Sequence, residues 1–424
     1  MSQGEEENKP PHDPYAALRF ANYRRLLTGQ FLASLGDRMV SVAVGWQIYE
    51  QTHSTWALGL VGLVEVIPVI LLSLPAGLLS DRSNRKRLAV LMRCVLASGY
   101  LGLGLISLTH GSLNLLYGCL FAIGVARAIY GPASSTLVPL TIPEDKFANA
   151  VSWSSNSWQM ASAIGPALTG WIIAISHGST VIYWFGMVAS LVYAILVGSI
   201  QGRQVIRAAK APTMEALAVG INFLRQSPVL LATITLDLFA VLLGGATALL
   251  PVFASDILHV GPVGFGWLRA APSIGAVLMA LFLAHQPPFT QAGKALLWSV
   301  AGFGAATVVF GVSRSFPLSL AMLFLLGAFD NVSVVIRSAL LLLRAPDEMR
   351  GRVSAVNSIF VGTSNELGDF ESGAVAALTN PVFAVVTGGI GTILVVILTG
   401  LIWPQLRELG PLSEKPPSEP ASEP

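Results

Sequence analysis

Twelve long apolar segments run along the chain, and this pattern constrains the fold more than any other feature of the sequence. Each is long enough to cross the roughly 30 Å hydrocarbon core of a bilayer as a helix rising about 1.5 Å per residue. They cover residues 26–49, 56–80, 88–108, 113–137, 150–175, 180–200, 229–253, 263–284, 295–312, 317–342, 353–378 and 382–403. Composition agrees, because 53% of the residues are hydrophobic and only 11% are charged. We predict an all-α membrane protein with twelve transmembrane helices.

Lysine and arginine gather in one alternate set of the connections between these segments. The set holds Arg19, Arg24, Arg25, Arg82, Arg85, Lys86, Arg87, Lys146, Arg203, Arg207, Lys210, Arg225, Lys294, Arg344, Arg350, Arg352, Arg407 and Lys415. The opposite connections carry Arg314 and the histidines His53, His110, His177 and His259. Because basic residues are retained on the cytoplasmic side, we expect a multi-pass protein of the bacterial cytoplasmic (inner) membrane with both termini in the cytoplasm.

The first apolar segment is expected to stay in the mature protein. It carries Asp37 and Arg38 and lacks the short apolar core and small-residue cleavage site of a signal peptide. The longest connection divides the helices six and six, and it contains a possible interfacial helix at residues 214–225. The expected order is a cytoplasmic N-terminal segment (1–25), a first half (26–200), a cytoplasmic linker (201–227), a second half (228–404) and a disordered cytoplasmic tail (405–424).

The two halves carry traces of a duplication. Six residues of the fourth segment and the loop after it recur 203 positions later; they are Leu120, Phe121, Gly124, Pro143, Glu144 and Asp145, matched by Leu323, Phe324, Gly327, Pro346, Asp347 and Glu348. At a shift of 204, Gly62, Glu65 and Pro68 face Gly266, Arg269 and Pro272. Two blocks with nearly the same shift favour a parallel repeat of six helices about an axis along the membrane normal.

Sequence motifs in the first half resemble those of a transporter superfamily. Gly77, Asp81, Arg82, Arg85 and Lys86 have the spacing GxxxDRxxR[KR] that is the loop signature of the major facilitator superfamily. Stretches 18–36, 52–62 and 351–360 are most similar to the bacterial branch that contains the enterobactin exporter and macrolide efflux proteins. The resemblance spans all twelve helices and implies two pseudo-symmetric six-helix halves, the major facilitator fold, that expose a central site alternately to each side.

Two motifs carry further expectations from this resemblance. Gly165, Pro166 and Gly170 are similar to the GPxxGG pattern of antiporters, with Thr169 in place of one glycine, and imply export. The loop signature implies a gate that braces the cytoplasmic start of the eleventh helix, where Arg350 and Arg352 lie. The alternative is that its arginines only fix topology. The corresponding loop after the eighth segment, 285–293, lacks the signature.

Ionisable residues inside the apolar segments are the most informative chemistry, since such a group in hydrocarbon costs several kcal/mol unless it is paired or faces water. The resemblance places helices 1, 4, 7 and 10 around the central cavity, and with them Asp37, Arg127, Asp237 and Asp330. The repeat makes Arg127 and Asp330 equivalent, so we expect them to pair across the cavity. For every such charge the alternative is an ion pair that only fixes packing.

Carboxylates are the expected carriers of coupling protons. Asp37 and Glu65 reach similar depths in antiparallel helices, and with Arg127 they are the first candidates. Glu366 and Asp369 are three residues apart on one helix face, so their mutual repulsion favours a proton on one of them. Glu371 adds a third acid to this helix. Protons entering from outside are expected to neutralise Asp37 or Glu65, with Arg127 stabilising the ionised form between cycles.

Other function classes find little support. The chain has no GxxxxGK[ST], GxSxG or HExxH motif, so we expect no enzyme, and we expect no cofactor and no metal. Cys94 and Cys119 stand alone in apolar stretches, and no basic run suggests a nucleic-acid partner. The sequence predicts a monomeric, proton-coupled exporter of a small organic molecule, siderophore-like or drug-like. A lipid or lysolipid transporter is the alternative, and a non-transporting membrane sensor is another. Trp153, Trp158 and Gln159 could contact an aromatic solute, or the tryptophans could be interfacial anchors.

Overall fold

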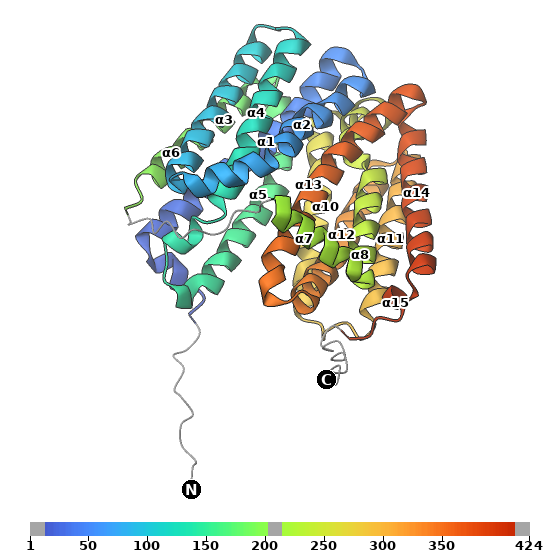
Figure 1. Ribbon diagram of the computed structural model, residues 1–424. Coiled ribbons are helices and arrows are strands. Elements are labelled where there is room, and N and C mark those ends of the chain that lie inside the picture. Colours follow the sequence, from blue (N-terminus) through green and yellow to red (C-terminus); the bar gives the residue numbers. More distant parts are fainter. Residues whose placement is uncertain (1–12, 202–213, 412–424) are drawn as a thin grey trace, which may run out of the picture.

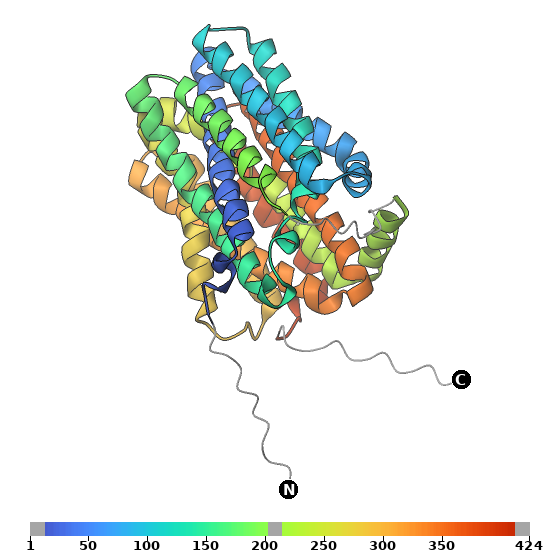
Figure 2. The ribbon, with the colours of Figure 1, turned by 90° about the vertical axis from the view of Figure 1, so that its left-hand side faces the viewer.

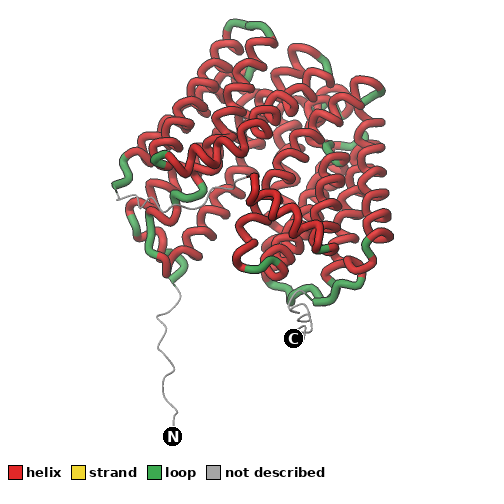
Figure 3. The backbone as a smooth tube through the Cα atoms, in the orientation of Figure 1, coloured by secondary structure: helices red, strands yellow, loops and turns green. Residues whose placement is uncertain are grey.

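The computed structural model describes residues 13–201 and 214–411, and within these ranges every regular element is a helix (Figure 3). The first half contains α1 (Ala21–Thr52), α2 (Thr55–Arg82), α3 (Arg85–Leu108), α4 (Leu113–Ser134), α5 (Phe147–Ser176) and α6 (Thr180–Gly198). The second contains α7 (Met214–Gln226), α8 (Pro228–Leu243), α10 (Gly261–Ala284), α11 (Ala292–Val312), α12 (Phe316–Arg344), α13 (Asp347–Leu378), α14 (Pro381–Ile402) and the short α15 (Pro404–Arg407). Parts of three predicted regions lie outside the described residues, namely 1–12, 202–213 and 412–424, with Arg203, Arg207, Lys210, Lys415 and most of the tail.

The helices form two bundles side by side, with α1–α6 in one and α8–α14 in the other (Figure 1). Between the bundles α2 packs along α13 and α5 packs along α10. Both ends of the described chain lie at the same end of the molecule, as two perpendicular views agree (Figures 1 and 2). Four histidines, His53, His110, His177 and His259, adopt left-handed backbone conformations at turns after helical segments.

Ten helices within the described residues are long and apolar enough to cross a membrane, judged by length and composition. The other two long helices, α1 and α13, have 32 residues each but are more polar, with Asp37 and Arg38 in one and Glu366, Asp369 and Glu371 in the other. A helix that lines a polar cavity needs less apolar surface than one that faces lipid on most sides. The twelve predicted segments each coincide with a helix or a series of helical turns.

The seventh predicted segment, 229–253, is not one helix. It breaks at Gly244 and Gly245 and continues through a short 3₁₀ turn η4 (Ala246–Leu249), α9 (Leu250–Val252) and a π turn η5 (Phe253–Ile257). Such irregular backbone is tolerated at membrane depth only where protein or a water-filled cavity surrounds it. The prediction of a continuous helix was therefore wrong, and the break leaves the Thr247 carbonyl oxygen able to accept a hydrogen bond from Arg269 at 3.0 Å.

The predicted repeat is visible in the packing. Gly124 of α4 lies against Pro68 of α2, where an added Cβ would sit 3.2 Å from the proline Cγ. The equivalent Gly327 of α12 lies against Pro272 of α10, where an added Cβ would sit 2.6 Å from the proline Cα. The same glycine-on-proline crossing thus joins the second and fourth helices of each half.

Glycines bring the halves closest together at the end of the molecule away from the chain ends. A Cβ on Gly373 of α13 would lie 2.5 Å from the Cα of Gly59 in α2, and one on Gly170 of α5 would lie 2.9 Å from the Cα of Gly266 in α10. Backbone approach this close requires small residues on both helices. We call these two crossings the glycine seal. The Tyr49 hydroxyl donates a hydrogen bond to Asp256 across the same end.

Candidate functional site

Two adjoining cavities lie between the halves, one of about 680 Å³ and one of about 800 Å³. Six residues line both, so the two spaces form one continuous site; they are Arg38, Trp158, Thr247, Val361, Asn365 and Asp369. The first cavity reaches toward the glycine seal at Gly45 and Leu58. The second reaches toward the end where the chain termini lie, along Ser154 and Arg337. We call the combined space the central site.

All seven residues that the sequence singled out for coupling line the central site. Asp37, Glu65, Arg127, Glu366 and Asp369 line the first cavity, and Asp237, Asp330 and again Asp369 line the second. The structure also shows which of these charges have partners. The roles of the individual residues stay predictions.

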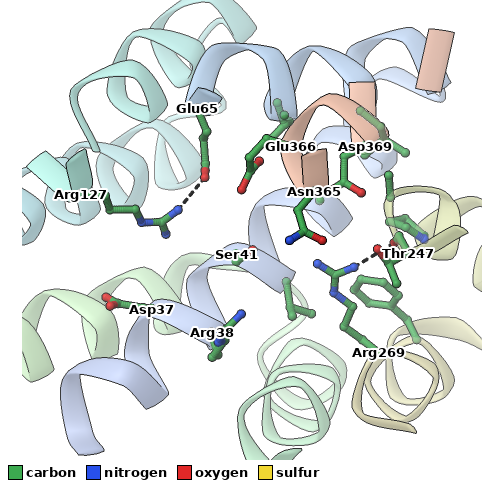
Figure 4. Close-up of a pocket in the computed structure, with 18 of the residues that line it drawn as sticks. Asp37, Arg38, Ser41, Glu65, Arg127, Thr247, Arg269, Asn365, Glu366 and Asp369 are labelled. Atoms are coloured by element: carbon green, nitrogen blue, oxygen red, sulfur yellow. Dashed lines mark hydrogen bonds and ion pairs between the residues drawn. The ribbon is translucent and has the colours of Figure 1, made fainter. Parts of the chain in front are cut away.

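Glu65 and Arg127 form an ion pair within the first half (Figure 4). The Arg127 Nη1 donates to Glu65 Oε2 at 2.5 Å, joining α4 to α2. The expected pair between Arg127 and Asp330 is absent. Arg127 pairs with the neighbouring helix of its own half, whereas Asp330 lines the second cavity.

Asp37 is held by a second set of polar groups in the first half. Arg93 Nη1 donates to both carboxylate oxygens at 2.9 Å, and the Tyr100 hydroxyl donates at 2.7 Å. The Arg93 guanidinium also lies over the Tyr130 ring, 4.2 Å from its centre, and only 4% of the Arg93 side chain is exposed. A buried charge with this many partners is well compensated.

Arg93 did not stand out in the sequence. Arg93 lies eight residues after the first residue of α3, which begins in the basic stretch Arg85, Lys86 and Arg87. Because it is close to this stretch, it resembles one more of the basic residues that set topology. The signal that could have found it is its spacing of seven from Tyr100, which puts both side chains on one face of α3 two turns apart.

The second half places one buried ion pair and three acids without an ion pair in the central site. Asp237 of α8 pairs with Arg337 of α12, and both side chains are less than one-tenth exposed. Among the described residues, neither Asp330 nor Glu366 nor Asp369 forms an ion pair. Glu366 and Asp369 point into the first cavity from α13 (Figure 4).

Two arginines in the central site also lack a carboxylate partner among the described residues. Arg38 of α1 lies over the Trp158 ring, 4.9 Å from its centre. Arg269 of α10 uses Nη1 for the Thr247 carbonyl. Arg38 and Arg269 thus face the same cavity as Glu366 and Asp369 from the opposite side of Figure 4. The site presents separated positive and negative groups, which suits binding of a charged or polar solute.

The predicted motif residues are placed as follows. Gly165 packs against α1, with an added Cβ 3.1 Å from Arg38 Cβ, and Gly170 belongs to the glycine seal. Pro166 is buried in α5, and Thr169 bonds to the Gly165 carbonyl at 2.9 Å. The antiporter-like motif therefore shapes α5 where it meets both α1 and α10.

The loop after α2 contacts its own half. Lys86 Nζ donates to the carbonyls of Gly198 and Ile200 at 2.9 and 2.7 Å, tying the start of α3 to the end of α6. Asn84 caps α3 through the Arg87 N–H. Gly77 is buried near the end of α2, and Arg82 is exposed. At the start of α13, Arg352 and Val356 lie against Gly220 of α7.

Trp153 and Trp158 lie in different parts of the structure. Trp153 Nε1 donates to the Pro14 carbonyl at 2.9 Å, and its ring lies 6.0 Å from that of Tyr15, so it anchors the start of the described chain. Trp158 and Gln159 instead line the central site.

Comparison with known proteins agrees with this geometry. The family described as "Transmembrane secretion effector" matches residues 12–420. The chain belongs to this family of the major facilitator superfamily. It is 24% identical over 405 residues to the enterobactin exporter EntS of Citrobacter koseri and 24% identical over 404 residues to that of Escherichia coli, with 95% of each chain covered in both cases.

Solved structures of transporters share the fold. A bacterial homologue of the human lysosomal transporter Spinster, in an inward-facing and occupied conformation, superposes with a TM-score of 0.72 at 14% identity, covering 94% of this chain and 98% of that one. The nucleoside transporter NupG superposes with a TM-score of 0.70 at 11% identity, covering 90% and 98%. This superfamily member is thus a multi-pass secondary transporter of the inner membrane that takes a small-molecule substrate.

Proposed function

We propose that the chain is a proton-coupled exporter of a small organic compound that works by alternating access. The observation that carries the proposal is the central site itself, where unpaired acids of α13 face unpaired arginines of α1 and α10 in a space large enough for a drug-sized solute. The similarity over 95% of the chain to enterobactin exporters supports export and a siderophore-like or drug-like substrate.

The conformation fits a site that is open to the cytoplasm. The closest approaches between the halves and the Tyr49–Asp256 hydrogen bond lie at the end away from the chain ends, whereas the cavity lining extends toward the chain ends. The distribution of basic residues puts those ends in the cytoplasm. The substrate therefore enters the central site from inside, and the glycine seal closes the outer side.

Glu366 and Asp369 replace Asp37 and Glu65 as the leading proton carriers. Asp37 is held by Arg93 and Glu65 is held by Arg127, so both carboxylates already have ion-pair partners within the first half. Glu366 and Asp369 line the site without such a partner. In our proposal they exchange protons with the outside, and Arg127 keeps the ionised Glu65 in place.

The lining of the central site favours a polar or mixed solute over a lipid. A lipid transporter would need a long apolar groove, but the first cavity is bounded by seven charged residues; they are Asp37, Arg38, Glu65, Arg127, Arg269, Glu366 and Asp369. A sensor without transport would lack ion-coupled flux altogether. The loop signature of Gly77, Asp81, Arg82, Arg85 and Lys86 retains its proposed gating role for the outward-open state, in which α13 would approach it.

Proteoliposome transport tests the proposal. The purified protein is reconstituted, and counterflow of labelled compounds, beginning with enterobactin and a macrolide, is measured with and without a pH gradient. We expect one compound class to exchange in both conditions and to accumulate only when the gradient is imposed. Exchange that never responds to the gradient would contradict proton coupling, and uptake of lysophospholipid alone would favour the lipid alternative.

A further inference from the structure

The repeat places a sign-inverted copy of the Glu65–Arg127 ion pair in the second half. Glu65 of α2 corresponds to Arg269 of α10, and Arg127 of α4 corresponds to Asp330 of α12. The acid and the base have therefore exchanged helices between the halves. Because each pair sits at an equivalent helix crossing, the second half contains the parts of the same interaction.

Packing in the first half fixes the geometry of the formed pair. Glu65 precedes Pro68 by three residues, and Arg127 follows Gly124 by three residues. Gly124 and Pro68 are the contact at which α4 crosses α2. The two charged side chains therefore meet about one helical turn from this contact.

Packing in the second half reproduces this frame. Arg269 precedes Pro272 by three residues, Asp330 follows Gly327 by three residues, and Gly327 lies against Pro272. The backbone around Arg269 and Asp330 thus matches a frame in which an acid and an arginine do pair.

The pair is nevertheless open in the structure. Arg269 donates to the Thr247 carbonyl in the broken seventh segment, and its guanidinium lines the first cavity. Asp330 lines the second cavity and makes no hydrogen bond or ion pair with a described residue. Both charges are therefore presented to the central site rather than to each other (Figure 4 shows Arg269 in this position).

The surroundings of Arg269 indicate which ligand it would take. Arg38, also without a carboxylate partner among the described residues, lies in the same cavity over the face of Trp158. An arginine over an indole ring, with a second arginine lining the same cavity, suits a small aromatic anion, whose charged group binds guanidinium and whose ring packs on the aromatic side chain. The acids of α13 lie on the opposite wall, where protonation would lower their repulsion of such an anion.

We propose that Arg269 binds the negative group of a small aromatic anion in the conformation described above, and that Asp330 displaces this anion from Arg269 in the outward-open conformation. This inference rests on the proposed export function and names its substrate class. Closure of the Arg269–Asp330 pair would release the anion outside. The first half keeps its equivalent pair closed and so serves as the fixed counterpart.

Binding of a matched pair of probes tests the first part. Radiolabelled 1-naphthoate and its neutral amide, 1-naphthamide, are titrated against the full-length protein in nanodiscs. We expect the wild type to prefer 1-naphthoate, and Arg269→Gln to weaken 1-naphthoate binding about tenfold or more while 1-naphthamide changes less than about twofold. Arg314→Gln, the same change at an exposed residue outside both cavities, should alter neither. No preference in the wild type, or equal loss of both probes in Arg269→Gln, would overturn the proposal.

Asp330→Asn and cysteine cross-linking test the second part. The variant should keep or tighten 1-naphthoate binding yet slow its outward release from proteoliposomes about tenfold. With Cys94 and Cys119 replaced by serine, the Arg269→Cys/Asp330→Cys pair should be joined by a short bis-maleimide. Loss of binding in Asp330→Asn, or cross-linking of Arg269→Cys to Asp369→Cys in place of position 330, would refute it.

These measurements separate the inference from the function on which it rests. Probe binding and cross-linking need neither a proton gradient nor a direction of transport. If probe binding and cross-linking give the expected results while gradient-driven accumulation is absent, proton coupling is refuted and the anion site is supported. If accumulation succeeds while they fail, the exporter stands without this site.

Discussion

The two halves of the transporter share a backbone frame but treat their charges differently. In the first half the acids Asp37 and Glu65 are closed in ion pairs with Arg93 and Arg127. In the second half only Asp237 has a partner of this kind among the described residues, and Asp330, Glu366 and Asp369 face the central site. The difference indicates that the two copies of a duplicated bundle can take different roles. One copy keeps a rigid polar core, and the other supplies charges that can exchange partners.

Removal of Arg93 should cause the largest loss of stability. A small loss would contradict the view that the first half contains a rigid polar core. Arg93→Gln leaves the partly buried Asp37 carboxylate without its main partner, which costs about 2 kcal/mol in unfolding free energy. We expect a clear drop in Tm measured by thermal unfolding in detergent. Arg87→Gln, the same change at an exposed residue of the same helix, is the control and should leave the Tm in place.

Neutralising the unpaired acids should affect transport rather than folding. The double change Glu366→Gln and Asp369→Asn removes charges that have no ion-pair partner among the described residues, so the Tm should stay the same or rise. Gradient-driven transport should fall about a hundredfold, while substrate counterflow, which requires no net proton movement, should persist. Glu371→Gln on the same helix is the matched control, since Glu371 lines neither cavity. Unchanged accumulation would remove these acids from the coupling mechanism.

A pair of double-mutant cycles sharpens the comparison at equivalent positions. The cycle of Glu65→Gln with Arg127→Gln should show a coupling energy of about 1.5 kcal/mol in unfolding free energy. The cycle of Arg269→Gln with Asp330→Asn should show less than half of that, because the two side chains are apart in this conformation. Equal coupling energies would mean that the halves do not differ in the way described.

The smallest expected effect concerns the hydrogen bond between Tyr49 of the first half and Asp256 of the second. Tyr49→Phe removes the bond to Asp256, worth about 1 kcal/mol, and should shift the population toward the outward-open state about fivefold. Labelling of a Ser41→Cys variant from outside by an impermeant maleimide measures the shift. Tyr117→Phe, which loses a hydrogen bond to Ala57 within the first half, should leave the labelling rate unchanged.

Much of the fold was predictable because its causes are local. Bilayer thickness sets segment length, and close helix crossings need small residues, so Gly124, Pro68, Gly327 and Pro272 carry the duplication into the sequence itself. The resemblance also placed Asp37, Arg127, Asp237 and Asp330 around a central cavity from helix order, and all four line the central site. Segment length, the positions of small residues and helix order can each be read from a single helix or from its equivalent in the other half.

The partners of the charges were not predictable from one sequence. Whether Arg127 meets Glu65 or Asp330 depends on helix rotation, and rotation is set by packing that spans the whole bundle. The break after Leu243 was missed because Gly244 and Gly245 lie in an apolar run that length alone makes look continuous. Arg93 was missed because the sequence does not reveal which neighbouring helix its face of α3 packs against.

The glycine seal has a consequence for the speed of the transport cycle. Where Gly59 meets Gly373 and Gly170 meets Gly266, backbone lies on backbone, and these four residues have no side chains that must change rotamer before the helices part. Helix surfaces of this kind let the two halves rock against each other with a low energy barrier. Alanine in place of any of these four glycines would add a methyl group that obstructs this movement. We expect such a change to lower the turnover rate of transport more than it lowers the stability of the fold.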